Sequence, residues 1–510
     1  MSKYYVTTAI DYVNAKPHLG TAYEKIGADC LARYKRLAGF DTYFLMGTDE
    51  HSTNVEKEAA QLGEDAQAYC DRMAEEFEAV WAKLHISYDQ FIRTTDPSHA
   101  NAVQDIFQKI YDNGYIYTGL YKGLYCVSCE EFVGEKDLVD GKCPRHQQEP
   151  EWIEETNYFF ALSKFSDRLR NHIETHPEFI QPDIRRNEIL NVIKLGLEDV
   201  SISRTGKKWG VPLPMAENQV VYVWFDALIN YVSALGYAGG SNEKFLRYWP
   251  ADCHIIGKDI TRFHCLIWPA MLMAADITLP KCVFGHGFVY SRGTKMSKTL
   301  GNIVDPNEMA SFFGADVLRY ILLRGIAFNR DGDFTVEQSI TRYNAELANE
   351  LGNLFSRTLS MVQRYRKGEI PEWTSEAGAD YNRLTEGMVD QYQVFMDRLA
   401  FDEALDAMWK SIQAANRYVE EKKPWELARA DDKAALWNTL RALLEVLRTV
   451  SVLCVPFMPV KAAEMRGQLG LPDDISAMKL EEARNPGDTG WKKIGAITPL
   501  FPKLESPAEE

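Results

Sequence analysis

The first fifty residues alternate between apolar runs and an amphipathic stretch. Residues 3–10 are short, apolar and rich in β-formers, and a turn containing proline and glycine follows at residues 16–20. Apolar positions then recur at helical spacing over residues 22–37, and residues 44–46 predict a second strand that ends in a polar loop at residues 47–52. This order is typical of a βαβ unit. We therefore expect a ligand site where the strands end.

The middle of the chain interrupts this pattern. From about residue 115, short aromatic strands, glycine turns and a group of cysteines indicate an inserted module. Apolar strand segments return at residues 220–224 and 253–256 and predict the second half of the interrupted sheet. After residue 339, Leu, Ala, Val and Met recur at spacings of three and four, as a helical bundle requires. The prediction is an α/β fold: a Rossmann-like parallel-sheet domain with an insertion, followed by an α-helical bundle.

Composition narrows the class of protein. A chain of 510 residues predicts two to four domains. The net charge of −16 argues against a general nucleic-acid binder, although it leaves room for a local basic strip. No apolar run is long enough to cross a bilayer and the first residues do not form a secretory signal, so we expect a cytoplasmic protein without a membrane partner. Six of the nine cysteines are scattered, which is typical of a reducing compartment.

The other three cysteines form a candidate metal site. Cys126 and Cys129 are separated by two residues, and thirteen residues later Cys143 and His146 repeat that spacing. Two such pairs supply three thiolates and one imidazole, which complete a tetrahedron around Zn²⁺ and leave no position for water. We predict one structural zinc per chain. Chance clustering is the alternative, and a redox pair explains the second pair of ligands less well.

Two segments carry candidate phosphate-binding groups. His18 and Gly20 lie in the turn between the first strand and the first helix, where backbone N–H groups and the helix dipole favour an anion. Lys295 and Lys298 follow a glycine-containing turn and can neutralise a polyphosphate. Taken alone, a histidine in a turn is more often structural, and a pair of lysines is more often a solvated loop.

Together these two segments resemble a known pair of motifs. The letters HLGT at residues 18–21 and KMSKT at residues 295–299 are similar to the paired motifs of class I aminoacyl-tRNA synthetases. Within that class the chain most resembles the methionyl-tRNA synthetase family, with further matches at residues 12–14, 47–51, 197–204, 222–231, 257–260, 353–357 and 424–425. The resemblance implies ATP-dependent activation of L-methionine to methionyl-adenylate and transfer to the 3′ end of initiator and elongator tRNA(Met). AMP and pyrophosphate are released, and Mg²⁺ enters with ATP.

The resemblance also implies roles for single residues. His18, Lys295 and Lys298 would be catalytic, and the residues that bind ATP would be His18, Gly20, Thr21, Lys295, Ser297 and Lys298. The methionine pocket would be formed by Ile10, Tyr12, Asp49, Trp224, Ala227, Leu228, Tyr231, Ile260 and His264. Asp49 would bind the substrate ammonium, while the Tyr231 hydroxyl and a backbone N–H near Ile10 would reach the sulfur. Asn353, Arg357 and Trp425 would read the anticodon.

The same resemblance implies an organisation in five segments. Residues 1–115 and 219–285 would be the two halves of the catalytic Rossmann domain, and residues 116–218 the insertion with the zinc knuckle of a bacterial form. Residues 286–340 would be a stem-contact linker with the lysine loop, and residues 341–510 the anticodon-binding bundle. No appended C-terminal tRNA-binding domain is expected, which favours a monomer.

Three positions depart from the family pattern. Thr21 stands where the first motif has a second histidine, Asp11 where an apolar or aromatic residue is usual, and Ser52 where glycine is common. A threonine followed three residues later by a glutamate is a helix-start pattern, so our hypothesis is that Thr21 and Glu24 form a coupled cap.

Two rival functions stay open at this point. Another class I synthetase, for cysteine or leucine, would share the two motifs but not Asn353, Arg357 and Trp425 in a bundle. A catalytically inactive relative that only binds RNA is favoured by Thr21 and disfavoured by the lysine pair. The aromatic run at residues 222–231, without its flanking motifs, is more simply a core segment.

Overall fold

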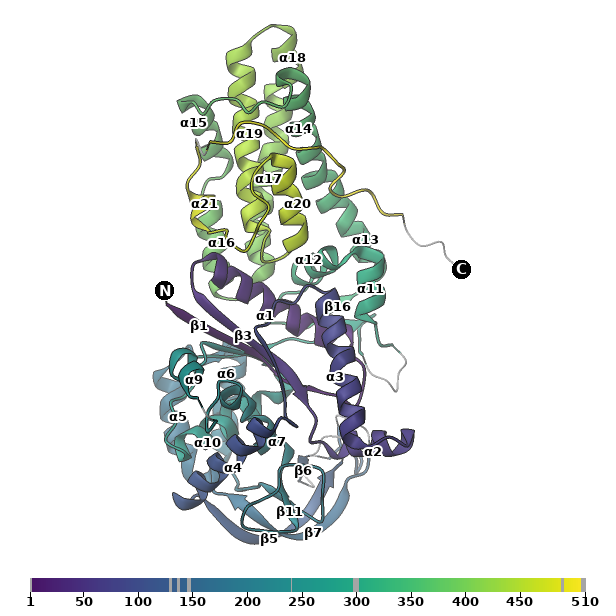
Figure 1. The fold of residues 1–510 in the computed structure, drawn as a ribbon, viewed down its shortest axis with the longest axis vertical. Coiled ribbons are helices and arrows are strands. Elements are labelled where there is room, and N and C mark those ends of the chain that lie inside the picture. Colours follow the sequence, from purple (N-terminus) through teal and green to yellow (C-terminus); the bar gives the residue numbers. More distant parts are fainter. Residues whose placement is uncertain are drawn as a thin grey trace.

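A parallel sheet forms the centre of the larger part of the molecule (Figure 1). The computed structural model describes residues 2–127, 131–134, 138–144, 148–239, 241–296, 302–487 and 490–505. Within them the sheet has the order β2-β3-β1-β12-β13-β8, with β4 also paired to β3. Its strands are β1 Lys3–Thr8, β2 Asp11–Tyr12, β3 Asp41–Asp49, β4 Gln90–Arg93, β8 Ile180–Gln181, β12 Cys253–Gly257 and β13 Val283–His286. The predicted α/β class is confirmed.

Each inner strand is buried on both faces. Successive side chains of a strand point to opposite sides, so Val6 packs into one hydrophobic core and its neighbour Tyr5 into another. Phe44 and Leu45 divide in the same way on β3. Strands buried on both faces read as continuous apolar runs, which is why residues 3–10 and 44–46 could be recognised.

Helices cover both faces of this sheet. The helices of this part are α1 Leu19–Leu37, α2 Thr53–Leu62, α3 Ala66–Lys83, α4 Pro97–Asp112, α8 Asn230–Ser233, α9 Glu243–Tyr248, α10 Trp268–Ala274, α11 Pro306–Phe313 and α12 Ala315–Gly325. α1 contacts β1, β3 and α12. It begins three residues before the predicted 22–37 because the His18 side chain caps its first turn.

The insertion is built on a second, antiparallel sheet at the end of the molecule opposite the bundle (Figure 1). Its order is β6-β5-β7-β9, formed by β5 Ile116–Cys126, β6 Glu131–Val133, β7 Glu151–Phe160 and β9 Val200–Ser201. α5 Ser166–Thr175 and α6 Asp183–Leu195 follow, and between them β8 returns to pair with β13 of the parallel sheet. The chain of the insertion therefore also contributes an edge strand to the main sheet.

One predicted strand is wrong. Residues 220–224 do not join the parallel sheet: β11 Gln219–Val221 pairs with β10 Ser203–Thr205, and the chain then turns into the helix α7 Val223–Ala227. A short apolar run has the same pattern in a buried strand and in a buried helix. The prediction for residues 253–256 is confirmed by β12.

The C-terminal part is a bundle of long helices (Figure 1). α13 Val336–Arg342 continues through a π-helical segment, Tyr343–Gly352, into α14 Asn353–Arg366. The remaining helices are α15 Ser375–Leu384, α16 Met388–Asp397, α17 Phe401–Lys422, α18 Pro424–Arg429, α19 Lys433–Leu453, α20 Pro459–Leu469 and α21 Glu481–Arg484. The chain after α21 runs back along the bundle, where Asn344 exchanges hydrogen bonds of 2.8 and 3.0 Å with the backbone of Leu504.

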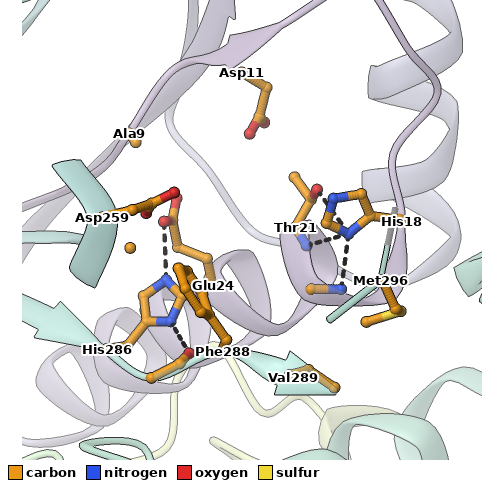
Figure 2. A pocket seen from close by; sticks show the side chains of 13 residues that line it. Ala9, Asp11, His18, Thr21, Glu24, Asp259, His286, Phe288, Val289 and Met296 are labelled. Atoms are coloured by element: carbon orange, nitrogen blue, oxygen red, sulfur yellow. Dashed lines mark hydrogen bonds and ion pairs between the residues drawn. The ribbon is translucent and has the colours of Figure 1, made fainter. Parts of the chain in front are cut away.

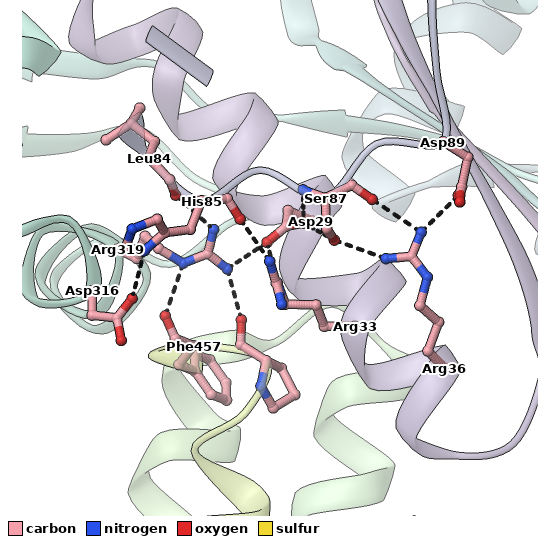
Figure 3. A network of polar contacts seen from close by, with 11 residues as sticks. Asp29, Arg33, Arg36, Leu84, His85, Ser87, Asp89, Asp316, Arg319 and Phe457 are labelled. Atoms are coloured by element: carbon pink, nitrogen blue, oxygen red, sulfur yellow. Dashed lines mark hydrogen bonds and ion pairs between the residues drawn. The ribbon is translucent and has the colours of Figure 1, made fainter. Parts of the chain in front are cut away.

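Arg319 joins the sheet domain to this bundle (Figure 3). Asp29 of α1 and Arg319 of α12 are both fully buried, with 2.6 Å between carboxylate and guanidinium. Arg319 also donates hydrogen bonds to the carbonyl oxygens of Pro456 and Phe457, in the turn between α19 and α20. The helix that begins at His18 is thus connected to the bundle through Arg319.

Among the described residues, no helix is both long enough and apolar enough to cross a membrane.

Candidate active site

The carboxyl ends of four parallel strands meet over two adjoining cavities. β1 is followed by Ala9, which lines both cavities. β3 ends in Asp49, while Gly257 ends β12 and His286 ends β13. The expected location of the ligand site at this edge of the sheet is therefore matched by the position of the cavities.

The larger cavity has a volume of about 250 Å³ and lies against the start of α1 (Figure 2). His18 caps this helix: its Nδ1 accepts hydrogen bonds from the N–H groups of Gly20, at 3.0 Å, and Thr21, at 3.2 Å. An Nδ1 that accepts must be unprotonated, so the ring hydrogen is on Nε2. The histidine therefore presents a donor at a helix N-terminus, where an anion is favoured.

Gly20 makes this arrangement possible. A Cβ atom at this position would lie 2.9 Å from Cε1 and 3.1 Å from Nδ1 of His18, closer than van der Waals contact allows. Any larger residue would push the imidazole away from the helix start.

The hypothesis of a cap formed by Thr21 and Glu24 is wrong. Thr21 Oγ1 lies 3.4 Å from Nδ1 of His18, which already caps the helix. Glu24 instead receives hydrogen bonds from Lys25, at 2.7 Å, and from Nε2 of His286, at 3.0 Å. A carboxylate gains more from an ammonium group and an imidazole together than from one hydroxyl, and it therefore turns into the cavity.

Glu24 and His286 form an ion pair on the cavity wall (Figure 2). The Nδ1 of His286 lies 2.7 Å from the Gly287 carbonyl oxygen and its Nε2 lies 3.0 Å from Glu24, so both ring nitrogens face acceptors. Burial alone raises the pKa of Glu24, but Lys25 and His286 outweigh burial and lower that pKa to about 2. The cavity wall thus contains a histidine paired with a carboxylate, which the motifs did not identify.

The lysine segment enters this cavity through a hairpin. β14 Val289–Ser291 pairs antiparallel with β15 Thr294–Lys295, and the connecting Arg292 and Gly293 both have positive φ, as a tight hairpin turn requires. Met296, the next residue, lines the cavity. The side chain of Lys295, together with Ser297 and Lys298, lies outside the described residues.

The smaller cavity gathers all the residues that the resemblance assigns to methionine. Its lining is Ala9, Ile10, Tyr12, Asp49, Trp224, Ala227, Leu228, Asn230, Tyr231, Ile260 and His264. Its volume is about 30 Å³, room for one water molecule rather than for a side chain. Trp224 stacks on Phe263 with ring centroids 3.8 Å apart, and Tyr12 meets its edge.

Tyr231 and His264 are joined at the base of this cavity. The Nδ1 of His264 lies 3.1 Å from the carbonyl oxygen of Ile260, to which it donates. Burial lowers the pKa of His264 to about 4, so the ring is neutral and its Nε2 accepts from the Tyr231 hydroxyl at 2.7 Å. The Tyr231 hydroxyl, which we expected to contact the thioether sulfur of methionine, donates its hydrogen to His264 in this structure.

A buried carboxylate, Asp226, connects two segments next to the smaller cavity. Asp226 of α7 lies 2.7 Å from Nδ1 of His51 and 2.8 Å from Nε2 of His99, and His99 in turn contacts Ser233. Burial favours a higher pKa for Asp226, but the two histidines outweigh burial and lower that pKa to about 2. This network holds the loop after Asp49 against the helix that carries Trp224.

The other two departures from the family pattern have local explanations. Ser52 caps α2, where its Oγ accepts from the N–H of Asn54 at 3.1 Å. Asp11 pairs with the fully buried Lys25 at 3.0 Å, so the acidic residue balances a lysine on the adjacent helix.

The chain matches two families of known proteins. Residues 4–150 and 136–359 match the family described as tRNA synthetases class I (M), and residues 370–503 match the anticodon binding domain of methionyl tRNA ligase. The chain belongs to the methionyl-tRNA synthetase family. It is therefore a class I methionine–tRNA ligase, which activates methionine with ATP and transfers it to transfer RNA.

Individual relatives cover nearly all of this synthetase. The methionine–tRNA ligase of Caldanaerobacter subterraneus is 46% identical over 98% of the chain and 79% of its own length. That of Thermotoga maritima is 44% identical over 99% of the chain and 81% of its own length. The structure of the Mycobacterium tuberculosis enzyme in complex with methionyl-adenylate superposes with a TM-score of 0.92 at 42% identity, covering 98% of this chain and all of that one.

Two of the four predicted zinc ligands of the synthetase lie within the described residues. Cys126 at the end of β5 and Cys143 are both almost fully buried, in one small cluster with Val133. Cys129 and His146 lie outside the described residues, and no group of three metal-binding side chains is found in the part that the structure describes.

Two of the three residues predicted to read the anticodon, Arg357 and Trp425, lie close to each other in the bundle. Asn353 is exposed at the start of α14, one turn before Arg357. The Arg357 guanidinium lies 5.8 Å from the ring centre of Trp425, which is half-buried, and 2.8 Å from Glu420. Helices remote in sequence thus bring a stacking surface and a cation together.

Motif analysis missed several residues that line the cavities of this synthetase. His286 and Glu24 line the larger one, and Asn230 lines the smaller one. A usable signal existed for His286, because it is a polar residue at the end of an apolar strand segment. Nothing in the local pattern distinguishes Glu24 from an ordinary charged helix residue.

Proposed function

We propose that the larger cavity binds ATP and the smaller one the methionine side chain, so that the methionine carboxylate meets the α-phosphate beside Ala9. The observation that carries this proposal is that the two cavities adjoin at Ala9, one against the HLGT segment and the other lined by all nine residues assigned to methionine. The smaller cavity has to widen for the substrate, because its volume is only about 30 Å³.

In the activation step, a methionine carboxylate oxygen attacks the α-phosphorus and pyrophosphate leaves. The Nε2 hydrogen of His18 donates to a phosphate oxygen, and Gly20 and Thr21 offer the N-terminus of α1. Lys295, Ser297 and Lys298 hold the polyphosphate, and Mg²⁺ enters with ATP to neutralise phosphate charge. Catalysis of this kind relies on position and charge rather than on a protein nucleophile.

Methionine is selected by charge at one end and shape at the other. Asp49 accepts from the substrate ammonium, and the walls of the pocket are formed by Ile10, Tyr12, Trp224, Ala227, Leu228 and Ile260. Sulfur is a weak acceptor, so contacts with aromatic rings contribute much of the selectivity. Contact of the sulfur with the Tyr231 hydroxyl requires that the bond to His264 be given up.

The tRNA contacts the bundle far from the cavities. We assign the reading of the anticodon to Asn353, Arg357 and Trp425, because unpaired bases are recognised by stacking and by hydrogen bonds to their edges. Support comes from the exposed Asn353 and from the cation that Arg357 places beside the Trp425 ring.

A structural Zn²⁺ fits the insertion. Cys126, Cys129, Cys143 and His146 would hold it. The burial of Cys126 and Cys143 supports this, since Val133 is the one apolar side chain packed against them among the described residues. A module with so small an apolar core needs another source of stability, which a closed metal site supplies.

The five-segment division of the sequence is proposed with the same boundaries, namely residues 1–115, 116–218, 219–285, 286–340 and 341–510. The bundle of α13 to α20 supports the last of these. Protein synthesis places the work of this enzyme in the cytoplasm. Its monomeric state stays a prediction, which sedimentation equilibrium of the purified protein tests.

The proposal is tested by ATP–pyrophosphate exchange with methionine, cysteine or leucine as the only amino acid. Exchange with methionine alone, together with isolation of methionyl-adenylate, supports it. Exchange that prefers cysteine or leucine, or none with any of the three, would refute it.

A further inference from the structure

A fully buried lysine lies beneath the nucleotide cavity. Lys25 of α1 donates to the carbonyl oxygen of Ala9 at 2.8 Å, and its ammonium pairs with Glu24 at 2.7 Å and Asp11 at 3.0 Å. These three acceptors use all three hydrogens of an ammonium group. Lys25 therefore cannot reach a substrate, and its effect on the site passes through the two carboxylates.

One oxygen of Asp11 remains without a partner. Oδ1 faces Lys25, whereas Oδ2 is buried and receives no hydrogen bond from any described residue. The side chain is 13% exposed and lines the larger cavity (Figure 2). Buried acceptors are normally satisfied, so an unpaired oxygen at a ligand cavity marks a place for a donor from the ligand.

The two steps of the reaction differ in whether the nucleophile carries a proton that has to be removed. In activation the nucleophile is a carboxylate, which has no proton to lose. In transfer the nucleophile is a ribose hydroxyl of the terminal adenosine of the tRNA, which must lose its proton as it attacks. A carboxylate beside the reacting groups is therefore useful in the second step and of no use in the first.

We propose that Asp11 is a catalytic residue of the transfer step and accepts the proton of the attacking tRNA hydroxyl. The hydroxyl oxygen forms a bond to the carbonyl carbon of methionyl-adenylate, and its proton moves to Oδ2 of Asp11. The bond from that carbon to the phosphate oxygen breaks, and AMP leaves with the electron pair. The inference rests on the proposed function of the cavity, because it assumes that the adenylate is bound there.

The surroundings of Asp11 suit this role. Burial raises the pKa of Asp11, Lys25 lowers it and Glu24 raises it, and the net result is a pKa of about 7. His18, Asp259 and His286 are the other ionisable groups that line this cavity. A general base works best when its pKa is near the working pH, and Lys25 limits the repulsion between this carboxylate and bound ATP.

The two steps can be measured separately on the full-length enzyme. Methionyl-adenylate is formed on the enzyme first, tRNA is then added, and charging is followed in a single turnover from pH 6 to pH 8.5. Activation is followed by ATP–pyrophosphate exchange. For the wild type we expect the transfer rate to rise with pH and level off above about 7, because Asp11 becomes ionised.

Asp11→Asn preserves an oxygen for Lys25 but cannot take a proton. We expect transfer to fall about 100-fold or more, activation to fall much less, and the pH dependence of transfer to disappear. Asp11→Glu should restore part of the rate and the pH dependence. Asp167→Asn, which removes a carboxylate that is 94% exposed on α5, is the control and should change neither step.

Three results would overturn the proposal: equal loss in both steps with Asp11→Asn, a pH dependence that survives in that variant, or a flat wild-type profile. Equal loss would make Asp11 a binding or structural residue. If Asp11→Asn does not fold, the pH profile of transfer in the wild type and the transfer rate of Asp11→Glu still test whether Asp11 accepts the proton. Failure of the proposed function would look different, because the wild type would then show no exchange with methionine.

Discussion

Replacing Arg319 by methionine should loosen the joint between the sheet domain and the bundle. The change leaves Asp29 buried with Arg33 and Ser87 as its remaining partners, and it removes donors from the carbonyl oxygens of Leu84, Pro456 and Phe457. Breaking a buried ion pair from one side costs about 3–5 kcal/mol. The Arg33 pair at 2.7 Å keeps the expected cost near the lower end, about 3 kcal/mol.

Hydrogen exchange measures this cost locally. Amides of α12 and of the first turn of α20 should exchange about 100-fold faster in Arg319→Met, because about 1.4 kcal/mol corresponds to a factor of ten. Arg36→Met is the matched control (Figure 3). Arg36 lies on the same helix α1 as Asp29, but its pair with Asp89 has side chains 31% and 37% exposed, and such pairs contribute about 0–1 kcal/mol.

Lowering the pH should remove the stabilisation that the Asp29–Arg319 pair provides. Burial favours a higher pKa for Asp29, but Arg33 and Arg319 outweigh burial and hold its pKa well below the usual range. A carboxylate whose pKa is lowered in the folded protein stabilises the fold at pH values above its unfolded pKa of about 3.9. This contribution is lost only as the pH falls through the folded pKa.

If the amides of α12 and α20 exchange no faster in Arg319→Met than in Arg36→Met, the Arg319 contacts do not hold the two parts together.

Three further changes test the lysine loop, the anticodon residues and the zinc site separately. Lys298→Ala should slow ATP–pyrophosphate exchange at saturating ATP while methionine binding stays nearly intact, and an unchanged rate would remove the lysine from catalysis. Trp425→Ala removes a stacking surface worth about 1–3 kcal/mol per base, so tRNA charging should fall while exchange persists; equal loss in both assays would indicate a packing residue. Freshly purified protein should contain about one zinc per chain, and Cys126→Ser should lower both zinc content and thermal stability; metal-free wild-type protein would contradict the site.

Much of the lining of the smaller cavity could be predicted because its residues belong to short motifs. Trp224, Ala227, Leu228 and Tyr231 lie within one turn or two of each other, and a motif preserves their spacing wherever the segment folds. The structure brings them to the same cavity as Asp49, from the end of β3. The secondary structure of the same segment was harder: residues 220–224 were predicted as a strand of the parallel sheet and instead lead into α7.

The partner of Glu24 could not be predicted from the neighbouring residues in the sequence. The pattern from Thr21 to Glu24 fits a helix cap, yet Glu24 pairs with His286, 262 residues away in sequence. A cap is a contact within one turn, whereas the choice between a hydroxyl and an imidazole as partner depends on which groups the fold brings within 3 Å. The same limit applies to Asp11, whose pairing with Lys25 is not part of any motif.

Periodicity and motif spacing were sufficient for the strands β1, β3 and β12, for the first helix and for most of the lining of the smaller cavity, because apolar repeats and short motifs act over a few residues. The partners of the charged groups could be identified only from the tertiary structure. Arg319, Asp29 and Lys25 look like ordinary surface residues in the sequence, yet all three are fully buried. A charge can be buried only where opposite charges and hydrogen bonds surround it, and those neighbours are assembled by contacts between segments hundreds of residues apart.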